Sequence, residues 1–209
     1  MQIILGRHGQ TLHNVQNLCS GQNDIELTDH GIWQAHALGD AMKKLGVTKL
    51  FCSDLRRALQ TASIVAEYVE CIPIPRQELR ERSFGRFEGE KGDLLRADLS
   101  LKGEDPELYR PEGGENFSDI LDRVAPFLNY LKAYVTDNVV GIIAHGNLNS
   151  ALLGHWQKMN PCEVKQDSAC LNIIEEPFSV EPRCILVNSV EHLARNPTKT
   201  PASPTPFST

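Results

Sequence analysis

Several features that would point to a membrane, a redox scaffold or repeated modules are missing from this chain of 209 residues. No apolar run approaches the roughly 18 residues of a transmembrane helix, and no charged leader precedes a long apolar segment at the amino terminus. We therefore expect a cytoplasmic protein with no membrane partner. The six cysteines are scattered and include no Cys-x-x-Cys pair, which argues against a metal site or a disulfide framework.

Positive charge is also scarce, because 21 lysines and arginines stand against 27 aspartates and glutamates, for a net charge of −6. Non-specific binding to nucleic acid is therefore disfavoured. The length, with 41% hydrophobic and 23% charged residues, fits one α/β domain with a sizeable core. An acidic protein that binds an anion must gather its arginines locally, and the motifs below hold or adjoin Arg7, Arg56, Arg57, Arg82 and Arg86.

The stretch Arg7-His8-Gly9 follows the apolar run Ile3-Ile4-Leu5 after one residue, Gly6. It is predicted to be the turn at the carboxyl end of a first strand, the edge of an open α/β sheet where ligands bind. A guanidinium group matches phosphate oxygens bidentately, and a glycine lets the backbone approach closely. The turn therefore suits an anion, although an ordinary polar loop fits the same three residues.

Two further apolar runs are followed by residues that can bind an anion, an arginine after one run and a histidine after the other. Val47 to Cys52 leads to Ser53, which is predicted to cap a helix with Arg56 in its first turn, where the partial positive charge of the helix would reinforce an anion site. Arg57 is interpreted as a solvated surface arginine. The run from Val139 to Ala144 leads directly to His145, which by itself would be an ordinary structural histidine.

Periodicity and turn residues predict the remaining elements. Thr28 is expected to cap an amphipathic helix over 29–45, and Pro126 to kink or restart a long helix over 115–135. The other expectations are a loop over 15–27, an edge strand over 72–75, an insertion folding over the active site at 90–114, hairpin-like strands over 169–175 and 183–188, and a catalytic domain over 1–195 followed by a loose tail at 196–209.

Taken in order, the Arg7-His8-Gly9 motif, the segment 53–62, Glu81 within 79–89 and Ala144-His145-Gly146-Asn147 resemble the histidine phosphatase superfamily, which includes the cofactor-dependent phosphoglycerate mutases. The resemblance extends from residue 2 to about residue 190. It implies an α/β fold in which helices flank both faces of a mostly parallel central sheet, a phosphoglycerate mutase-like three-layer sandwich.

The resemblance also implies the roles of the site residues. His8 would be the nucleophile that forms a phosphohistidine, Arg7, Arg56 and His145 would neutralise the phosphate oxygens, and Glu81 would protonate the leaving oxygen. The implied substrate-binding residues are Asn14, Ser20, Gly21, Arg82, Gly146 and Asn147. No metal and no cofactor would be needed.

Within the superfamily, the sequence favours a phosphatase for a small phosphate monoester, with a sugar phosphate or bisphosphate as the expected class. Residues 90–114 lack a full match to the long mutase insertion, whereas Ser20-Gly21 and Glu81-Arg82 look mutase-like, so a phosphoglycerate mutase is the alternative. A catalytically inactive binding or scaffold protein is a third, although every core residue is present. Arg82, Arg86, Lys91 and Arg110 could each select a second anionic group, and a homodimer is among the oligomeric states left open.

Overall fold

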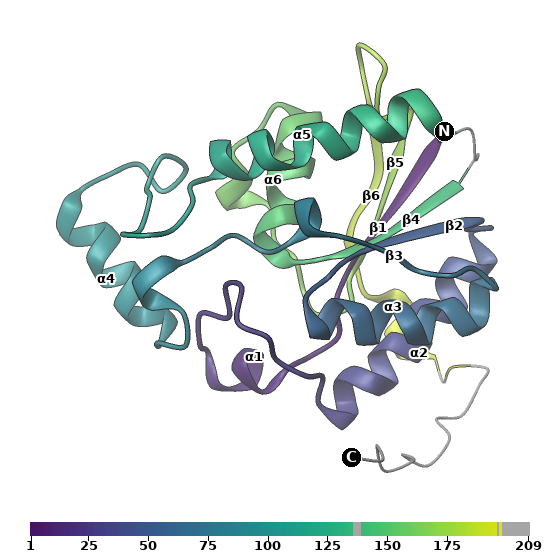
Figure 1. The fold of residues 1–209 in the computed structure, drawn as a ribbon, viewed down its shortest axis with the longest axis horizontal. Coiled ribbons are helices and arrows are strands. Elements are labelled where there is room, and N and C mark those ends of the chain that lie inside the picture. The colour runs from purple at the N-terminus through teal and green to yellow at the C-terminus, as the bar shows by residue number, and fades with distance from the viewer. Residues whose placement is uncertain (136–138, 196, 198–209) are drawn as a thin grey trace.

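Three apolar runs form adjacent parallel strands at the centre of one sheet. The computed structural model describes residues 1–135, 139–195 and 197, and in it the strands are β1 (Gln2–Arg7), β2 (Lys49–Ser53) and β4 (Val139–Ala144). β4 pairs in parallel with β1 on one side and with β2 on the other. Within these residues the sheet has six strands in the order β3-β2-β4-β1-β5-β6 (Figure 1).

The two edges of the sheet differ in direction. β3 (Ile74–Arg76) is a short parallel edge strand, as expected for a segment whose Pro75 cannot donate a ladder hydrogen bond. β5 (Leu171–Glu175) pairs antiparallel with β1, and β6 (Arg183–Ser189) pairs antiparallel with β5. The predicted hairpin-like edge is therefore confirmed.

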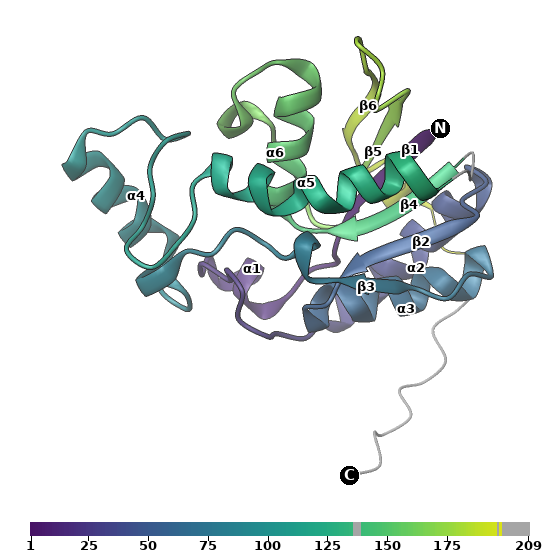
Figure 2. The ribbon, with the colours of Figure 1, turned by 45° about the horizontal axis from the view of Figure 1, so that its top comes forward.

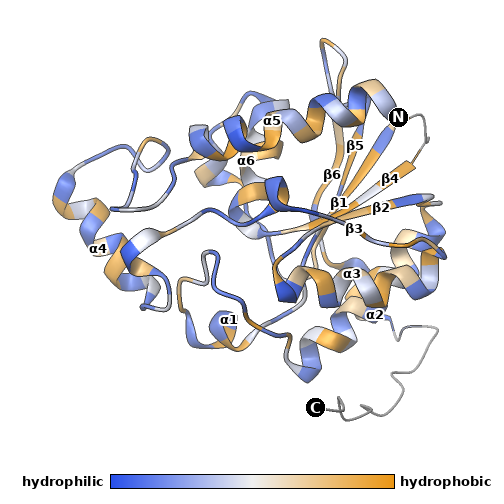
Figure 3. Ribbon diagram, viewed as in Figure 1, coloured by the Kyte–Doolittle hydropathy of each residue, from blue (hydrophilic) through white to orange (hydrophobic). Residues whose placement is uncertain are grey.

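Helices cover both faces of this sheet, so its central strands are buried on both sides. α2 (Asp29–Lys44) and α3 (Arg56–Val69) cover one face, and α5 (Phe117–Tyr134) and α6 (Gly146–Gln157) cover the other (Figure 2). Alternate residues of β1 serve the two faces: Ile3 and Leu5 pack with α5 and α6, and Ile4 packs with α2 and α3. The strands accordingly carry mostly hydrophobic residues (Figure 3), and the predicted three-layer α/β fold is confirmed.

Local capping signals set where the long helices begin. Thr28 accepts a hydrogen bond from the Gly31 N–H at the start of α2, as predicted. α5 begins after Asn116, whose side chain forms a reciprocal capping box with Asp119. Pro126 lies inside the unbroken span of α5, so it does not start a new helix.

Two further helices lie beyond the carboxyl ends of the central strands (Figures 1 and 2). α1 (Leu12–Gln16), which overlaps the expected loop 15–27, begins with a capping box between Thr11 and Asn14. α4 (Gly92–Lys102) lies within the predicted insertion, and the Gly92 N–H donates to the Asn17 carbonyl over 2.9 Å. The insertion is therefore tied to the segment that follows the first strand.

Short 3-10 segments connect these elements at Gln77–Leu79, Gly85–Phe87, Pro161–Glu163 and Glu191–Ala194. Across the described part of the chain, no helix combines the length and the apolar character needed to span a bilayer. The predicted tail, 196–209, lies outside the described residues apart from residue 197.

Candidate active site

The strand register brings the two motif histidines together. β1 and β4 pair with Arg7 opposite Ala144, and the His8 N–H donates to the Ala144 carbonyl over 3.0 Å. His145 is the next residue of its strand end, and its ring centroid lies 5.2 Å from that of His8. The two histidines therefore lie at one edge of the sheet, each at the carboxyl end of its strand.

His8 is buried and held in one tautomer. Its Nδ1 lies 2.7 Å from the carbonyl oxygen of Gly9. Because a carbonyl can only accept, Nδ1 carries the proton and Nε2 keeps its lone pair. Burial, followed by the charges of Arg57 and Arg7, holds the pKa of His8 well below its ordinary value of 6.5. The ring is therefore neutral at physiological pH, with Nε2 as a potential nucleophile.

Two neighbouring arginines occupy places opposite to those expected. The Arg57 side chain is buried, with 0% of the residue exposed, and its Nε donates to His8 Nε2 over 3.2 Å. The Arg56 side chain is 56% exposed and forms an ion pair with Glu26, with 2.8 Å between Nη1 and Oε1. The arginine that faces His8 is thus Arg57, and the expected placement of Arg56 beside the nucleophile is corrected.

The start of α3 explains the difference. The N-cap is Leu55, and the Ser53 hydroxyl accepts from the Leu55 N–H instead of capping the helix. Successive helical residues point about 100° apart, so only one of the two arginines can face the sheet edge. A sequence signal for this choice exists, because Arg57 is four residues before Thr61 and eight before Val65, all on the buried face of α3.

Backbone carbonyls fix the Arg57 guanidinium. Nη1 donates to the Asn23 carbonyl over 2.8 Å, and Nη2 donates to the Gly21 carbonyl over 2.7 Å. Burial lowers the pKa of Arg57 to about 10, against the opposing charge of Glu81. The guanidinium therefore stays cationic at neutral pH, in an orientation that is set before any ligand arrives.

His145 and Arg7 present buried polar atoms that the protein does not satisfy. Neither ring nitrogen of His145, nor the Arg7 Nε, has a hydrogen-bond partner among the described residues. Burial, then the charges of Arg57 and His8, keeps the pKa of His145 well below 6.5. Buried polar atoms without partners are costly and uncommon in folded proteins, and an oxyanion seated between His8 and Arg7 could accept hydrogen bonds from these donors.

The side-chain carboxylate of Glu81 lies at the amino terminus of α6. It accepts from the backbone N–H of Asn147 over 3.1 Å and of Leu148 over 3.2 Å, a location that the helix dipole favours for negative charge. A Cβ added at Gly146 would lie 3.6 Å from Arg7 Cζ and 3.7 Å from Glu81 Oε2. The Gly146 backbone therefore lies between the guanidinium and the carboxylate.

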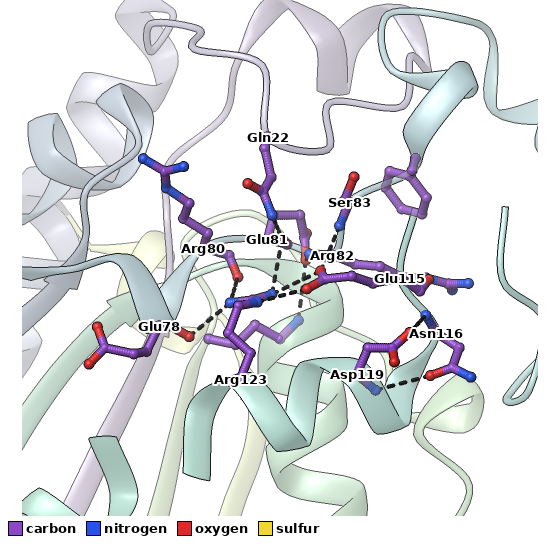
Figure 4. A network of polar contacts seen from close by, with 12 residues as sticks. Gln22, Glu78, Arg80, Glu81, Arg82, Ser83, Glu115, Asn116, Asp119 and Arg123 are labelled. Carbon is purple, nitrogen blue, oxygen red and sulfur yellow. Dashed lines mark hydrogen bonds and ion pairs between the residues drawn. The ribbon is translucent and has the colours of Figure 1, made fainter. Parts of the chain in front are cut away.

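Arg123 of α5 holds the Glu81 segment in place (Figure 4). Its guanidinium pairs with Glu115 and donates to the backbone carbonyls of Glu78, Arg80 and Glu81, over 2.8, 3.1 and 3.3 Å. Arg123 is a positioning residue that no motif in the sequence marked. Its place within α5, three residues after a buried Ile120, gave no sign of it.

A cavity of about 220 Å³ lies beside His8, and neither His145 nor Gly146 is among its lining residues. Asn14, Ser20, Gly21 and Asn147 line it with Arg7, His8, Arg57 and Glu81. Arg82 does not, because it is buried beside the cavity and its guanidinium donates to the carbonyls of Glu115 and Tyr109 over 2.7 and 2.6 Å. The remaining lining residues, which the motifs did not mark, are Asn17, Leu18, Cys19, Phe84, Gly92, Leu95 and Arg96.

A larger groove of about 1130 Å³ lies between α5, α6 and the turn that joins β5 to β6. It contains none of the histidine, arginine and glutamate cluster described above. Size therefore does not identify the functional site here, and the convergence of titratable groups does.

A close approach of two backbones supports the histidine turn. A Cβ at Gly9 would lie 2.4 Å from the Gly31 carbonyl oxygen, and a Cβ at Gly31 would lie 2.1 Å from the Gln10 carbonyl oxygen. Both contacts are shorter than any side chain tolerates, so glycine is required at both positions. The first turn of α2 can thus lie directly against the His8 turn.

The sequence profile of the histidine phosphatase superfamily, branch 1, matches residues 3–184. The chain belongs to the histidine phosphatase superfamily. It is 32% identical over 171 residues to a 2,3-bisphosphoglycerate-dependent phosphoglycerate mutase of Cytophaga hutchinsonii, covering 78% of this chain and 80% of that protein. It is 38% identical over 136 residues to fructose-2,6-bisphosphatase TIGAR B of Danio rerio, covering 62% of this chain and 52% of that protein.

Among solved structures, this histidine phosphatase superfamily member is similar to a mycobacterial glucosyl-3-phosphoglycerate phosphatase in complex with VO3. The TM-score is 0.82 at 29% identity, covering 90% of this chain and 98% of the other. The similar proteins include both phosphatases and mutases. Membership in the superfamily is therefore established, and the choice between hydrolysis and transfer depends on chemistry at the site.

Proposed function

We propose that the protein is a phosphatase that hydrolyses a small phosphate monoester, of the sugar phosphate or bisphosphate class, through a phosphohistidine on His8. The observation that carries this proposal is the neutral His8 ring, whose Nδ1 is held by the Gly9 carbonyl while Nε2 lies 3.2 Å from Arg57 Nε. The catalytic domain is residues 1–195, residues 90–114 form an insertion over the site, and the enzyme acts in the cytoplasm.

In the first step, His8 Nε2 attacks the phosphorus atom and the ester P–O bond breaks. Glu81, in its acid form, transfers its proton to the leaving oxygen. In the free protein, the Arg57 Nε–H donates to His8 Nε2. When the substrate binds, this N–H donates to a phosphate oxygen instead, so the Nε2 lone pair is free to attack. Arg7 and His145 donate to the other phosphoryl oxygens and stabilise the charge of the transition state.

In the second step, a water molecule attacks the phosphorus atom and the P–Nε2 bond breaks. The Glu81 carboxylate takes a proton from that water, so inorganic phosphate leaves and both His8 and Glu81 return to their starting forms. The fixed charges of Arg7 and Arg57 carry the electrostatic stabilisation in this scheme. We therefore expect turnover in the presence of EDTA.

A phosphoglycerate mutase is the second candidate, and its support is the identity to relatives that carry this name. A mutase returns the phosphoryl group from His8 to a different oxygen of the substrate before water reaches it. Hydrolysis needs only water at the same place. The two activities thus share the first step and differ in the acceptor of the second.

The test is phosphate release from p-nitrophenyl phosphate, fructose 2,6-bisphosphate and 3-phosphoglycerate, with EDTA and no added metal, beside a coupled assay for 2-phosphoglycerate. The expected result is phosphate release that His8→Ala abolishes, with a phosphorylated His8 trapped by rapid alkaline quench and mass spectrometry. Isomerisation with little free phosphate would identify the mutase instead. A folded protein silent in both assays and never phosphorylated would overturn the proposal and favour a binding or scaffold role.

A further inference from the structure

The cavity beside His8 carries positive charge on two separate walls. Arg7 and Arg57 come from the strand-end side, next to the nucleophile, and Arg96 comes from α4 of the insertion. Figures 1 and 2 show α4 beyond the carboxyl ends of the strands, outside the sandwich. Three arginines and a single carboxylate, Glu81, thus line one small cavity.

None of the basic residues that the sequence offered for a second anion lines this cavity. Arg86 pairs with Asp98 and Glu112, Lys91 donates to the Gln16 carbonyl, and Arg110 pairs with Asp119. The Arg82 guanidinium donates to the backbone carbonyls of Glu115 and Tyr109. Arg96 is therefore the cationic side chain that the insertion contributes to the site, among the residues the structure describes.

The Arg96 guanidinium is held loosely enough to change partners. Within the described residues it pairs with Asp93, one helical turn earlier, and the two side chains are 62% and 77% exposed. Solvent-exposed ion pairs of this kind contribute little free energy. An anion inside the cavity, where fewer water molecules compete, can replace Asp93 at small cost.

Gly92 keeps the space beside this guanidinium open. A Cβ at Gly92 would lie 3.4 Å from Arg96 Nη1 and 3.2 Å from Asn17 Oδ1. Arg96 Nη1 and the Asn17 amide therefore lie over the same glycine, at the point where the insertion is tied to the segment after α1. The nearby apolar walls are Leu18, Phe84 and Leu95.

We propose that the leaving group of the substrate carries a second anionic group, a carboxylate or a phosphate, and that Arg96 binds it. The phosphoryl group to be transferred lies between Arg7 and Arg57, and a short carbon skeleton spans the apolar walls to Arg96. The cavity of about 220 Å³ is smaller than the roughly 300 Å³ at which pockets for drug-sized ligands begin, so the skeleton is small. This inference rests on the proposed phosphatase function.

Three substrates that share a glycerol skeleton test it: 3-phosphoglycerate, with a carboxylate, glycerol 1,3-bisphosphate, with a second phosphate, and glycerol 3-phosphate, with neither. Arg96→Gln is expected to lower kcat/KM for the two substrates with a second anionic group about tenfold relative to glycerol 3-phosphate, the size expected for a charge-assisted contact that is partly exposed. Arg96→Lys should retain most of the preference. Arg86→Gln is the matched control, because it removes an insertion arginine that lies off the cavity.

A loss confined to one of the two substrates with a second anionic group would support the inference and identify that group as carboxylate or phosphate. An equal loss on all three substrates, or no loss on any, would overturn it and leave the phosphatase function standing.

Phosphate release from p-nitrophenyl phosphate, measured in parallel, tests the proposed function separately from the outcome in which none of the three compounds releases phosphate. In that case calorimetric titration of the same compounds into His8→Ala, with and without Arg96→Gln, decides the second-anion site alone. Tighter binding of the two compounds with a second anionic group than of glycerol 3-phosphate, lost in Arg96→Gln, would support the site, and equal binding of all three would overturn it.

Discussion

The sharpest prediction compares Arg57 with its neighbour Arg56. At about 4 Å and an effective dielectric constant of about 20, a unit charge beside a phosphoryl group contributes about 4 kcal/mol. Arg57 Nε already lies 3.2 Å from His8 Nε2, so a phosphorus atom bound to that nitrogen would be at about this range. We expect Arg57→Gln to lower kcat by roughly 10²- to 10³-fold.

Arg56→Gln is the matched control, because it removes the same charge one residue away. Its side chain is exposed and paired with Glu26, and such a pair is worth about 1 kcal/mol or less. We expect kcat to stay within about twofold of the wild-type value. Initial rates with p-nitrophenyl phosphate, beside urea unfolding to show that both variants fold, give the comparison; a large loss in Arg56→Gln with little in Arg57→Gln would refute the assignment.

The same variant makes a prediction about protonation. Burial is the first cause of the lowered pKa of His8, and the charge of Arg57 is the second. Arg57→Gln should therefore raise the pKa of His8 and move the acid limb of kcat/KM to higher pH, whereas Arg57→Lys should leave it close to wild type. Titration of the His8 ring by NMR measures this directly, and an unchanged pKa in Arg57→Gln would contradict the placement of the guanidinium.

Three further predictions follow from the site and its support. Glu81→Gln should lower kcat for an alkyl phosphate by roughly 10²- to 10⁴-fold and much less for p-nitrophenyl phosphate, whose leaving group needs no proton; equal losses in the two rate assays would exclude Glu81 as the acid. Arg123→Met leaves the half-buried Glu115 carboxylate without its ion-pair partner and removes the donor to three backbone carbonyls, and should cost about 1–3 kcal/mol of unfolding free energy, so an unchanged urea midpoint would contradict its anchoring role. His8 and His145 have lowered pKa values in the folded state, so below pH 6.5 the unfolded chain binds more protons and stability falls, by up to about 2.7 kcal/mol per pH unit for two protons. Urea unfolding between pH 7.5 and 5 should show this fall and a shallower one in His145→Asn; identical curves would argue against a buried neutral His145.

The parts of the fold that the sequence predicted depend on local signals. Thr28 is a capping residue followed by a regular apolar period, so the start of α2 follows from it. β1 ends at Arg7, directly before His8, and β4 ends at Ala144, directly before His145. Because both strands run parallel, the two histidines had to meet at one edge.

The parts that it missed depend on tertiary contacts. Whether Arg56 or Arg57 faces His8 depends on where α3 begins. The sequence predicted Ser53 as the N-cap, but the N-cap is Leu55, two residues later. The direction of Arg96 depends on the hydrogen bond that ties Gly92 to the Asn17 carbonyl, 75 residues away in the sequence. No spacing within the insertion encodes that contact.

The insertion is closed at its base. The Glu115 N–H donates to the Ser83 carbonyl, and the Ser83 N–H donates to the Glu115 carboxylate, each over 2.9 Å, although the two residues lie 32 positions apart. The Arg123 guanidinium forms an ion pair with the same Glu115 carboxylate. Changing the length of a closed loop alters its closure entropy only slowly. The chain between Ser83 and Glu115 is therefore a closed loop whose length and sequence can change without moving the strand ends that hold His8. Under the proposed function, such a change would alter which ester His8 cleaves.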